Sequence, residues 1–338
     1  MERRALITGV CGFIGSHLAE HLIRCGWAVD GIDHRPDTEN IAAVRDRIGF
    51  INAALSSDAL RSLRAPASYD VIFHLAGRLG PAEVVADPLT LLQEHALHAE
   101  AVCEFAAGAN AVVVLASSSE VYQWNRDEEM REDDALTIGP SHLPRCGYAI
   151  SKLHMEHVGL AYWRQRGVRV IVARFFNTVG PRQRDSFVLP IFAKQALRGE
   201  PLTVHGDGSQ TRTFTHVRDA VEALTALAAA PAALGEVVNV GAGHPCLPVA
   251  RVAAELARHV SATYDVVHPS PVTFIPYAAT GDLAWQRMNV RRPDVRKLER
   301  LTGLRFPDRW DEILRAVCAD WAARLGVAER AAARRGVT

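Results

Sequence analysis

The most informative segment of the chain reads Thr8-Gly9-Val10-Cys11-Gly12-Phe13-Ile14-Gly15. It joins an apolar run, Ala5–Thr8, to a helical pattern that covers Gly12–Cys25. In such a loop Gly9 permits a tight turn, Gly12 lets a pyrophosphate approach the backbone, and Gly15 lets the helix pack against the strand. The free N–H groups of the helix's first turn favour an anion. The segment predicts a dinucleotide-binding βα unit, and a plain glycine turn is the alternative.

The first half of the chain alternates strand-like apolar runs with helical patterns. We expect strands at Ala5–Thr8, Ala28–Asp33, Gly49–Ile51, Val71–Leu75, Ala111–Ala116 and Arg169–Phe175. Longer helices are expected at Leu89–Ala107 and Tyr148–Arg166. This alternation is typical of βαβ units with right-handed crossovers. It predicts an α/β fold with a Rossmann-type, doubly wound parallel sheet.

The second half has a different rhythm, because prolines interrupt it at short intervals. Helices are expected at Phe187–Leu197, Val217–Ala229, Val249–Val260 and Trp310–Leu325. We therefore predict a smaller C-terminal substrate-binding lobe. The expected division is a dinucleotide-binding domain over 1–176 with later returns to the sheet at roughly 205–242, a lobe over 177–330, and a tail over 331–338.

Composition excludes several classes of protein. Lys and Arg together number 38, as do Asp and Glu, so the chain lacks the basic excess of a nucleic-acid binder. No apolar run approaches the ~20 residues of a membrane span. A strand is expected almost at Met1, which leaves no room for a signal peptide. The six cysteines form no C-x-x-C pair, and the histidines show no zinc-binding spacing. We expect a cytoplasmic protein with reduced thiols and no metal.

Two strand ends complete the predicted dinucleotide site. Asp33 ends the second strand about twenty residues after the glycines, where a carboxylate can bind the ribose hydroxyls and favour NAD over NADP. Arg35 nearby is a counter-indication, because an arginine there can accept a 2′-phosphate. His74-Leu75-Ala76-Gly77 ends another strand with small residues that would let a cofactor lie across them. A solvated strand end and ordinary packing are the alternatives.

Tyr148 and Lys152 stand four residues apart on one face of an expected helix. A tyrosine with an ordinary pKa near ~10 is a poor base at neutral pH. A neighbouring Lys ammonium and a cationic nicotinamide would lower that pKa and favour the phenolate. Only Lys152, Lys194 and Lys297 are lysines, which makes a chance pairing less frequent. The spacing predicts a catalytic pair.

Hydroxyl side chains follow the strand Ala111–Ala116, in the segment Ser117-Ser118-Ser119-Glu120-Val121-Tyr122. The carboxyl end of a parallel strand is where ligands bind in open α/β sheets. One of these hydroxyls could hydrogen-bond a substrate hydroxyl during its oxidation. A serine-rich loop that only caps the strand is the alternative. The acidic run Glu132-Asp133-Asp134, further along, is expected to be solvated.

Together these motifs resemble the extended short-chain dehydrogenase/reductase family of nucleotide-sugar epimerases, dehydratases and decarboxylases. The resemblance also includes Arg174–Arg182, Gly206–Asp219 and Val238–Gly241, and it extends over nearly the whole chain. It implies NAD as cofactor, a nucleotide-sugar substrate with UDP as the expected nucleotide, and a homodimer formed through the helices Leu89–Ala107 and Tyr148–Arg166. The cofactor residues it implies are Gly9, Gly12, Phe13, Ile14, Gly15, Asp33, Leu75, Ala76, Tyr148 and Lys152.

The same resemblance assigns further roles. Tyr148 is similar to the family's base, Lys152 to the residue that holds the nicotinamide ribose, and Ser118 to the catalytic serine or threonine. The substrate-binding residues it implies are Ser119, Asn177, Arg182, Arg212 and Arg291. His95 stands where many relatives have asparagine.

Within the family, Ser118-Ser119-Glu120-Val121-Tyr122 resembles the corresponding segment of UDP-glucuronate decarboxylases. Arg291-Arg292-Pro293 resembles a segment that places an arginine near the sugar carboxylate. This implies catalytic Ser118, Glu120, Tyr148 and Lys152 and a product of UDP-xylose or its 4-keto form. A UDP-sugar 4-epimerase, a 4,6-dehydratase and an inactive nucleotide sensor are the alternatives, and a surface pair beside a proline turn is the alternative for Arg291.

Overall fold

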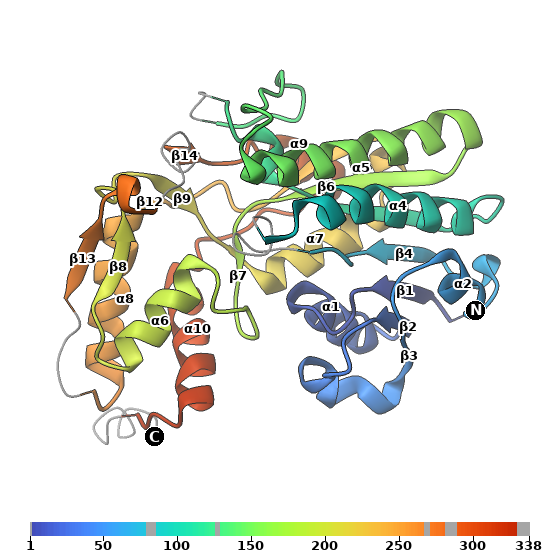
Figure 1. Cartoon of the computed structure of the whole chain (residues 1–338). Coiled ribbons are helices and arrows are strands. Elements are labelled where there is room, and N and C mark those ends of the chain that lie inside the picture. The colour runs from blue at the N-terminus through green and yellow to red at the C-terminus, as the bar shows by residue number, and fades with distance from the viewer. Residues whose placement is uncertain (1, 79–85, 126–128, 267–270, 281–288, 330–338) are drawn as a thin grey trace.

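The computed structural model describes residues 2–78, 86–125, 129–266, 271–280 and 289–329. Its centre is a seven-stranded sheet with the order β11-β6-β5-β4-β1-β2-β3 (Figure 1). Every neighbouring pair in it is parallel. The strands are β1 Arg4–Thr8, β2 Ala28–Asp33, β3 Ile48–Asn52, β4 Val71–His74, β5 Val112–Ser118, β6 Arg169–Phe175 and β11 Val237–Val240. The predicted Rossmann-type sheet is confirmed.

Helices cover both faces of the sheet (Figure 1). On one face α1 (Phe13–Arg24) packs beside α7 (Val217–Ala229), and on the other α4 (Pro88–Ala106) packs beside α5 (Pro144–Arg166). Alternate residues of the central strands enter opposite layers, as the two-residue period of a strand requires. Val112 and Val114 join the core under α1 and α7, whereas Val113 and Leu115 join the core under α4 and α5. Burial on both faces explains the continuous apolar run Val112–Leu115 of β5.

The lobe has a separate apolar core beyond the sheet. Three helices form it, α6 (Val188–Leu197), α8 (Val249–Thr263) and α10 (Trp310–Leu325), with β8 (Leu202–His205) paired to β13 (Val272–Ile275). A three-stranded sheet adjoins them with the order β12-β9-β14, formed by Cys246–Pro248, Thr211–Thr213 and Val290–Arg291. Where the chain crosses between the two halves, β7 (Thr178–Val179) pairs with β10 (Thr215–His216).

Several elements depart from the sequence expectations. Helix α5 begins at Pro144, four residues before the expected start, because proline is well suited to the first helical turn. Of the segment 205–242, only β11 enters the large sheet. The structure adds a helix that was not expected, α9 (Arg296–Thr302), which packs on α7 and β11. The expected tail, 331–338, lies outside the described residues. Short elements complete the chain: η1 Glu39–Arg47, α2 Ser57–Arg61, η2 Pro66–Ser68, η3 Ser119–Tyr122, η4 Pro231–Ala233 and η5 Tyr277–Thr280.

Candidate active site

The glycine loop between β1 and α1 has little free space around its backbone. Gly9 has a φ of 74°, in the left-handed region that glycine tolerates. A Cβ on Gly15 would lie 2.2 Å from the Gly9 carbonyl oxygen, and one on Gly9 would lie 2.8 Å from the Ala76 nitrogen. Helix α1 begins at Phe13, with Gly12 as the N-cap. Because the first-turn N–H groups of a helix lack intrahelical partners, this loop fits the diphosphate of NAD.

Asp33 braces the same loop from the end of β2. Its buried carboxylate accepts hydrogen bonds from the N–H groups of Cys11 and Arg35, both at 3.0 Å. The guanidinium of Arg35 folds back over the loop, and its Nη2 atom lies 3.5 Å from where a Gly12 Cβ would stand. The two predicted discriminators of NAD and NADP therefore lie together at the loop.

Tyr148 and Lys152 lie on the buried face of α5, with exposed fractions of 7% and 6%. The Nζ atom of Lys152 donates to the Ala116 carbonyl at 2.8 Å and lies 6.0 Å from the centre of the Tyr148 ring. Burial lowers the pKa of Lys152 to about 8, against the opposing effect of Glu156. Burial also raises the pKa of Tyr148, and a hydrogen bond with the Ser118 side chain opposes that rise. The tyrosine therefore depends on its neighbours to become a base.

The two serines at the end of β5, Ser117 and Ser118, contact different side chains. The Ser117 hydroxyl donates to Glu156 at 2.5 Å, one helical turn beyond Lys152 on α5. The Ser118 hydroxyl contacts Tyr148 and also accepts from the backbone N–H of Glu120 at 3.2 Å. Ser119 begins η3 and is buried. The end of the strand therefore places the Ser118 hydroxyl next to Tyr148.

A charged cluster lies beside Tyr148. Arg291 Nη2 lies 2.5 Å from the Glu120 carboxylate, and Nη1 donates to Asn177 Oδ1 at 3.4 Å. The side chains of Arg291 and Glu120 are only 12% and 18% exposed. Both charges act on the pKa of Tyr148, Glu120 raising it and Arg291 lowering it. The structure thus brings together a phenol, a carboxylate and a guanidinium from three separate parts of the chain.

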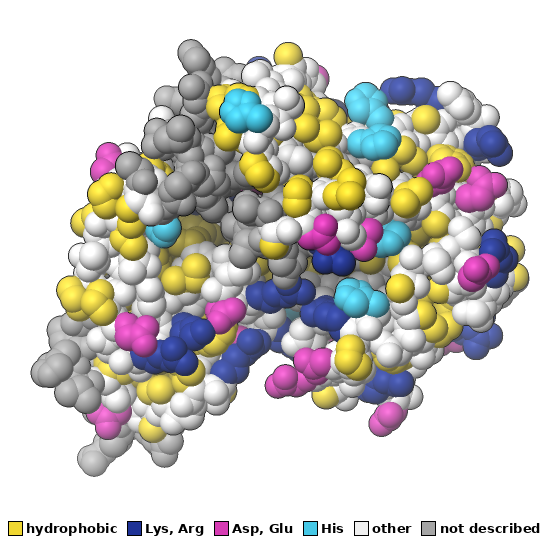
Figure 2. Space-filling model, in the orientation of Figure 1, with side chains coloured by type: hydrophobic (Ala, Val, Ile, Leu, Met, Phe, Trp, Pro, Cys, Tyr) yellow, Lys and Arg dark blue, Asp and Glu magenta, His cyan; other side chains and the backbone are white. Residues whose placement is uncertain are grey.

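Two further predicted arginines lie in different surroundings. Arg212 is the register partner of Arg291 in the parallel pair β9–β14, so both side chains project from the same face of that sheet. Arg182 does not join the cluster. Its guanidinium pairs with Glu20 of α1 at 2.6 Å and donates to the Asn40 carbonyl at 2.9 Å. On the face shown in Figure 2, basic side chains gather where the lobe meets the sheet domain.

A backbone clasp, which the sequence did not reveal, fixes the strand that carries Arg291. Met130 donates to the Arg292 carbonyl at 2.9 Å, and Asp294 donates to the Met130 carbonyl at 2.8 Å. Glu132, expected to be solvated, instead accepts from the backbone N–H of Asn239 at 2.9 Å, and its burial raises its pKa. The expectation of a solvated run is therefore wrong for Glu132, whereas Asp133 is exposed.

A buried polar network lies beneath the clasp. Arg174 makes a two-point ion pair with Glu156, at 2.9 and 2.8 Å, and also donates to the Tyr122 hydroxyl at 2.7 Å. The Tyr122 hydroxyl donates to Asn239 Oδ1 at 2.9 Å, and the Asn239 amide donates to the Met130 carbonyl at 2.9 Å. These bonds connect α5 and β6 to the clasp. The network therefore fixes the position of the helix that carries Tyr148 relative to the strand that carries Arg291.

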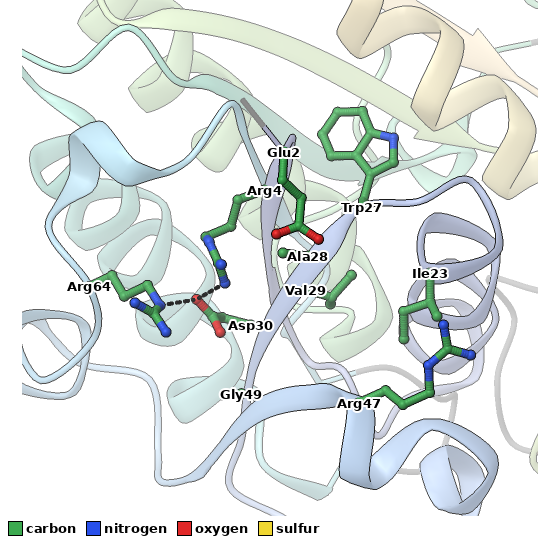
Figure 3. Close-up of a pocket in the computed structure, with 10 residues that line it drawn as sticks. All are labelled: Glu2, Arg4, Ile23, Trp27, Ala28, Val29, Asp30, Arg47, Gly49 and Arg64. Carbon is green, nitrogen blue, oxygen red and sulfur yellow. Dashed lines mark hydrogen bonds and ion pairs between the residues drawn. The ribbon is translucent and has the colours of Figure 1, made fainter.

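Another hollow lies at the opposite edge of the sheet, where β1, β2 and β3 begin (Figure 3). Two of its arginines point toward the Asp30 carboxylate, Arg4 at 3.5 Å and Arg64 at 3.4 Å, whereas Arg47 lies away from it (Figure 3). Ligands of open α/β sheets bind at the carboxyl ends of strands, so this hollow is remote from the expected site. Among the described residues no group of His, Cys, Asp and Glu is arranged to hold a metal, and no helix is long and apolar enough to cross a membrane.

Comparison with known proteins agrees with this geometry. The model of the NAD dependent epimerase/dehydratase family matches residues 5–241. The chain belongs to this family. The family's cofactor is NAD, and the glycine loop fits it.

Relatives of this family member include decarboxylases. It is 32% identical to UDP-N-acetyl-alpha-D-glucosaminuronate decarboxylase of Bacillus cytotoxicus, over 93% of this chain and 96% of that protein. It is 35% identical to UDP-glucuronic acid decarboxylase 1 of Danio rerio, over 89% of this chain and 68% of that protein. Among solved structures, the epimerase Mth375 of Methanothermobacter thermautotrophicus aligns with a TM-score of 0.84 and 26% identity, over 96% of this chain and 93% of that one.

Proposed function

We propose that this family member is a decarboxylase of UDP-linked uronic sugars, with UDP-glucuronate as the first candidate and UDP-xylose or its 4-keto form as product. The observation that carries this proposal is the Arg291–Glu120 pair beside Tyr148. A guanidinium suits a carboxylate ligand, and here one lies next to the tyrosine that would remove the proton of the sugar hydroxyl. The names of the two decarboxylases described above support the same reaction.

The first step would be oxidation of the sugar at C4. Tyr148 removes the proton of the C4 hydroxyl while Ser118 holds that hydroxyl in place. Lys152 keeps a positive charge near the phenolate and holds the nicotinamide ribose. When bound, NAD supplies an acceptor for the C4 hydride and later returns it. Because burial lowers the pKa of Lys152 only to about 8, the ammonium keeps its charge at neutral pH.

The second step would be loss of carbon dioxide. A ketone at C4 makes the sugar a β-keto acid, so the C5–carboxylate bond breaks and its electron pair moves toward the ketone oxygen. One proton is then added at C5, and formation of UDP-xylose consumes one proton overall. A guanidinium has five N–H donors, so Arg291 can hold both Glu120 and the sugar carboxylate. The negative charge of Glu120 would partly offset the attraction of Arg291 for the sugar carboxylate. The bound carboxylate is then not overstabilised before its charge is lost in the release of carbon dioxide.

The rest of the site would bind the nucleotide and organise the two halves. Asn177 and Arg212 would contact the UDP portion, and a planar guanidinium matches phosphate geometry. Residues 1–176, with returns at roughly 205–242, would hold NAD, and 177–330 would form most of the sugar-nucleotide lobe. Arg182 would contribute to substrate binding only through the loop that it ties to α1.

We also infer a homodimer in the cytoplasm. The outer face of α4 exposes Leu89 and Leu97, at 66% and 59%, and α5 lies beside α4 (Figure 1). Two exposed leucines two helical turns apart suit a helical interface between two copies. All six cysteines are free, which fits a reducing compartment. Sedimentation of wild type and L97E would test the dimer, and a monomeric wild type would refute it.

The enzymatic proposal is tested by mass spectrometry of the purified protein with NAD and UDP-glucuronate. A product lighter by carbon dioxide is the expected result. An unchanged mass with a shifted retention time would identify a 4-epimerase, and loss of water would identify a dehydratase. Nucleotide binding without any turnover would identify a sensor. Parallel assays with the N-acetylglucosaminuronate analogue would show which C2 substituent the site accepts.

A further inference from the structure

A buried histidine lies against the catalytic pair and has no part in the steps above. His95 is on α4 and is only 1% exposed. Its Nδ1 atom lies 2.8 Å from the Ser151 hydroxyl, which itself donates to the Tyr148 carbonyl at 2.8 Å. The His95 ring also meets the Tyr148 ring edge-on, with centres 5.8 Å apart. A side chain of α4 therefore contacts the one turn of α5 that carries both Tyr148 and Lys152.

The glycine at position 77 makes room for this ring. A Cβ on Gly77 would lie 2.8 Å from His95 Nε2 and 3.6 Å from Lys152 Nζ. The first separation is too short for a real Cβ, so the ring would have to move. Among the described residues, His95 Nε2 reaches no partner at hydrogen-bonding geometry, and the Arg78 backbone and the Lys152 ammonium are beside it. The imidazole and the ammonium thus share a space that exists because residue 77 lacks a side chain.

The surroundings keep His95 uncharged. Burial and then the Lys152 charge lower its pKa to about 2, and His74 on β4 and His98 on α4 add to this effect. Lys152 in turn is flanked by Glu156 on its own helix. A polar but neutral ring is thus the neighbour of the ammonium on the α4 side. It adds polarity there without a competing positive charge.

We propose that His95 is a positioning residue for the Tyr148–Lys152 pair and that Gly77 is the matched small residue that admits its ring. The ring holds the Tyr148 side chain through the edge contact and holds the helical turn through Ser151. It also gives the Lys152 ammonium a polar neighbour in a buried place. The inference rests on the proposed roles of Tyr148 and Lys152 and deepens them.

The first experiment measures the proton affinity of Lys152 directly, in NAD-loaded protein. Only three lysines are present, so protein labelled with carbon-13 lysine gives three signals, with Lys194 and Lys297 as internal references. In H95L an apolar neighbour makes the ammonium less favourable, so the Lys152 titration midpoint should fall by about one pH unit. H95N, which retains a polar group, should recover at least half of that shift. The same positions for wild type and H95L would overturn the proposal.

Turnover provides a second readout that a merely structural role would not change. In H95L the alkaline limb of kcat should move to lower pH with the lysine midpoint, kcat should fall about tenfold, and KM should change less than about twofold. H98L, one turn further along α4, is the matched control and should leave the midpoint and the limb in place. A uniform loss of activity with an unshifted pH profile would refute the positioning role.

A double-mutant cycle tests the pairing of residues 77 and 95. G77A should disturb the wild-type site because its Cβ meets the imidazole, whereas G77A combined with H95N should be less damaging than the product of the two single effects. Strictly multiplicative effects would overturn the pairing. If wild type does not decarboxylate any UDP-uronate, the lysine titration still tests His95, so the two proposals can fail separately.

Discussion

Replacing Arg291 with alanine is the sharpest test of the carboxylate site. Arg291 lies 2.5 Å from Glu120 and 3.4 Å from Asn177 Oδ1, and it is largely buried. A hydrogen bond to a charged group contributes about 1.5–3 kcal/mol. At 1.36 kcal/mol for each factor of ten, losing that contact with the sugar carboxylate in the transition state should lower kcat/KM about 10- to 150-fold. Carbon dioxide release from UDP-glucuronate measures this loss.

The adjacent arginine provides the matched control. Arg292 pairs with Glu129 at 3.9 Å, and both side chains are 37% exposed. Exposed pairs contribute about 0–1 kcal/mol, so R292A should change kcat/KM by less than about fivefold. Binding of UDP alone, measured by calorimetry, should be the same in both variants. Equal losses in R291A and R292A, or a loss in R291A that appears equally in UDP binding, would refute the assignment of Arg291 to the sugar carboxylate.

Three further outcomes are expected. First, kcat should fall as the pH rises through about 8, since Lys152 then loses its proton. The contribution of Lys152 to stability should rise between pH 8 and 10.5, because the unfolded chain still holds the proton that the folded chain has released. A pH-rate profile and urea unfolding measure the two trends, and a rise or fall of both together would contradict this account. Second, G15A should weaken NAD binding and lower stability by about 1–3 kcal/mol, because its Cβ would meet the Gly9 carbonyl; fluorescence titration with NADH and thermal unfolding check this, and unaltered binding would argue against the loop geometry. Third, R174A should cost about 3–5 kcal/mol in unfolding free energy, since it leaves the buried Glu156 carboxylate without its partner; a loss below about 1 kcal/mol would mean that the pair behaves as an exposed one.

The sequence predicts the sheet well because local signals determine it. The bounds of β2 and β6 agree with the predictions residue for residue. The pairing of Glu120 with Arg291 spans 171 positions, so no local pattern could show its geometry, and only a family resemblance suggested both residues. The helix α9 was missed because its sequence is strongly charged and its packing against α7 depends on the tertiary fold. Arg182 lies in a motif of the family, yet its side chain pairs with Glu20 and not with the cluster around Arg291. A motif gives the type of a residue but not the direction of its side chain.

Because the clasp joins Met130 to the segment around Pro293, the group that faces the sugar can change in evolution independently of the site for NAD. The glycine loop proposed to bind NAD lies in the first βα unit, whereas Arg291 is held by two segments that are distant in the sequence and contact each other. On the proposed function, exchanging these two segments together would alter the side chain that faces the sugar carboxylate without changing the glycine loop or the Tyr148–Lys152 pair. Exchanging only one of them would break the backbone bonds at Met130. A lineage that changes its sugar substrate should therefore show paired changes near residues 130 and 292, and a chimera built from two family members should exchange both.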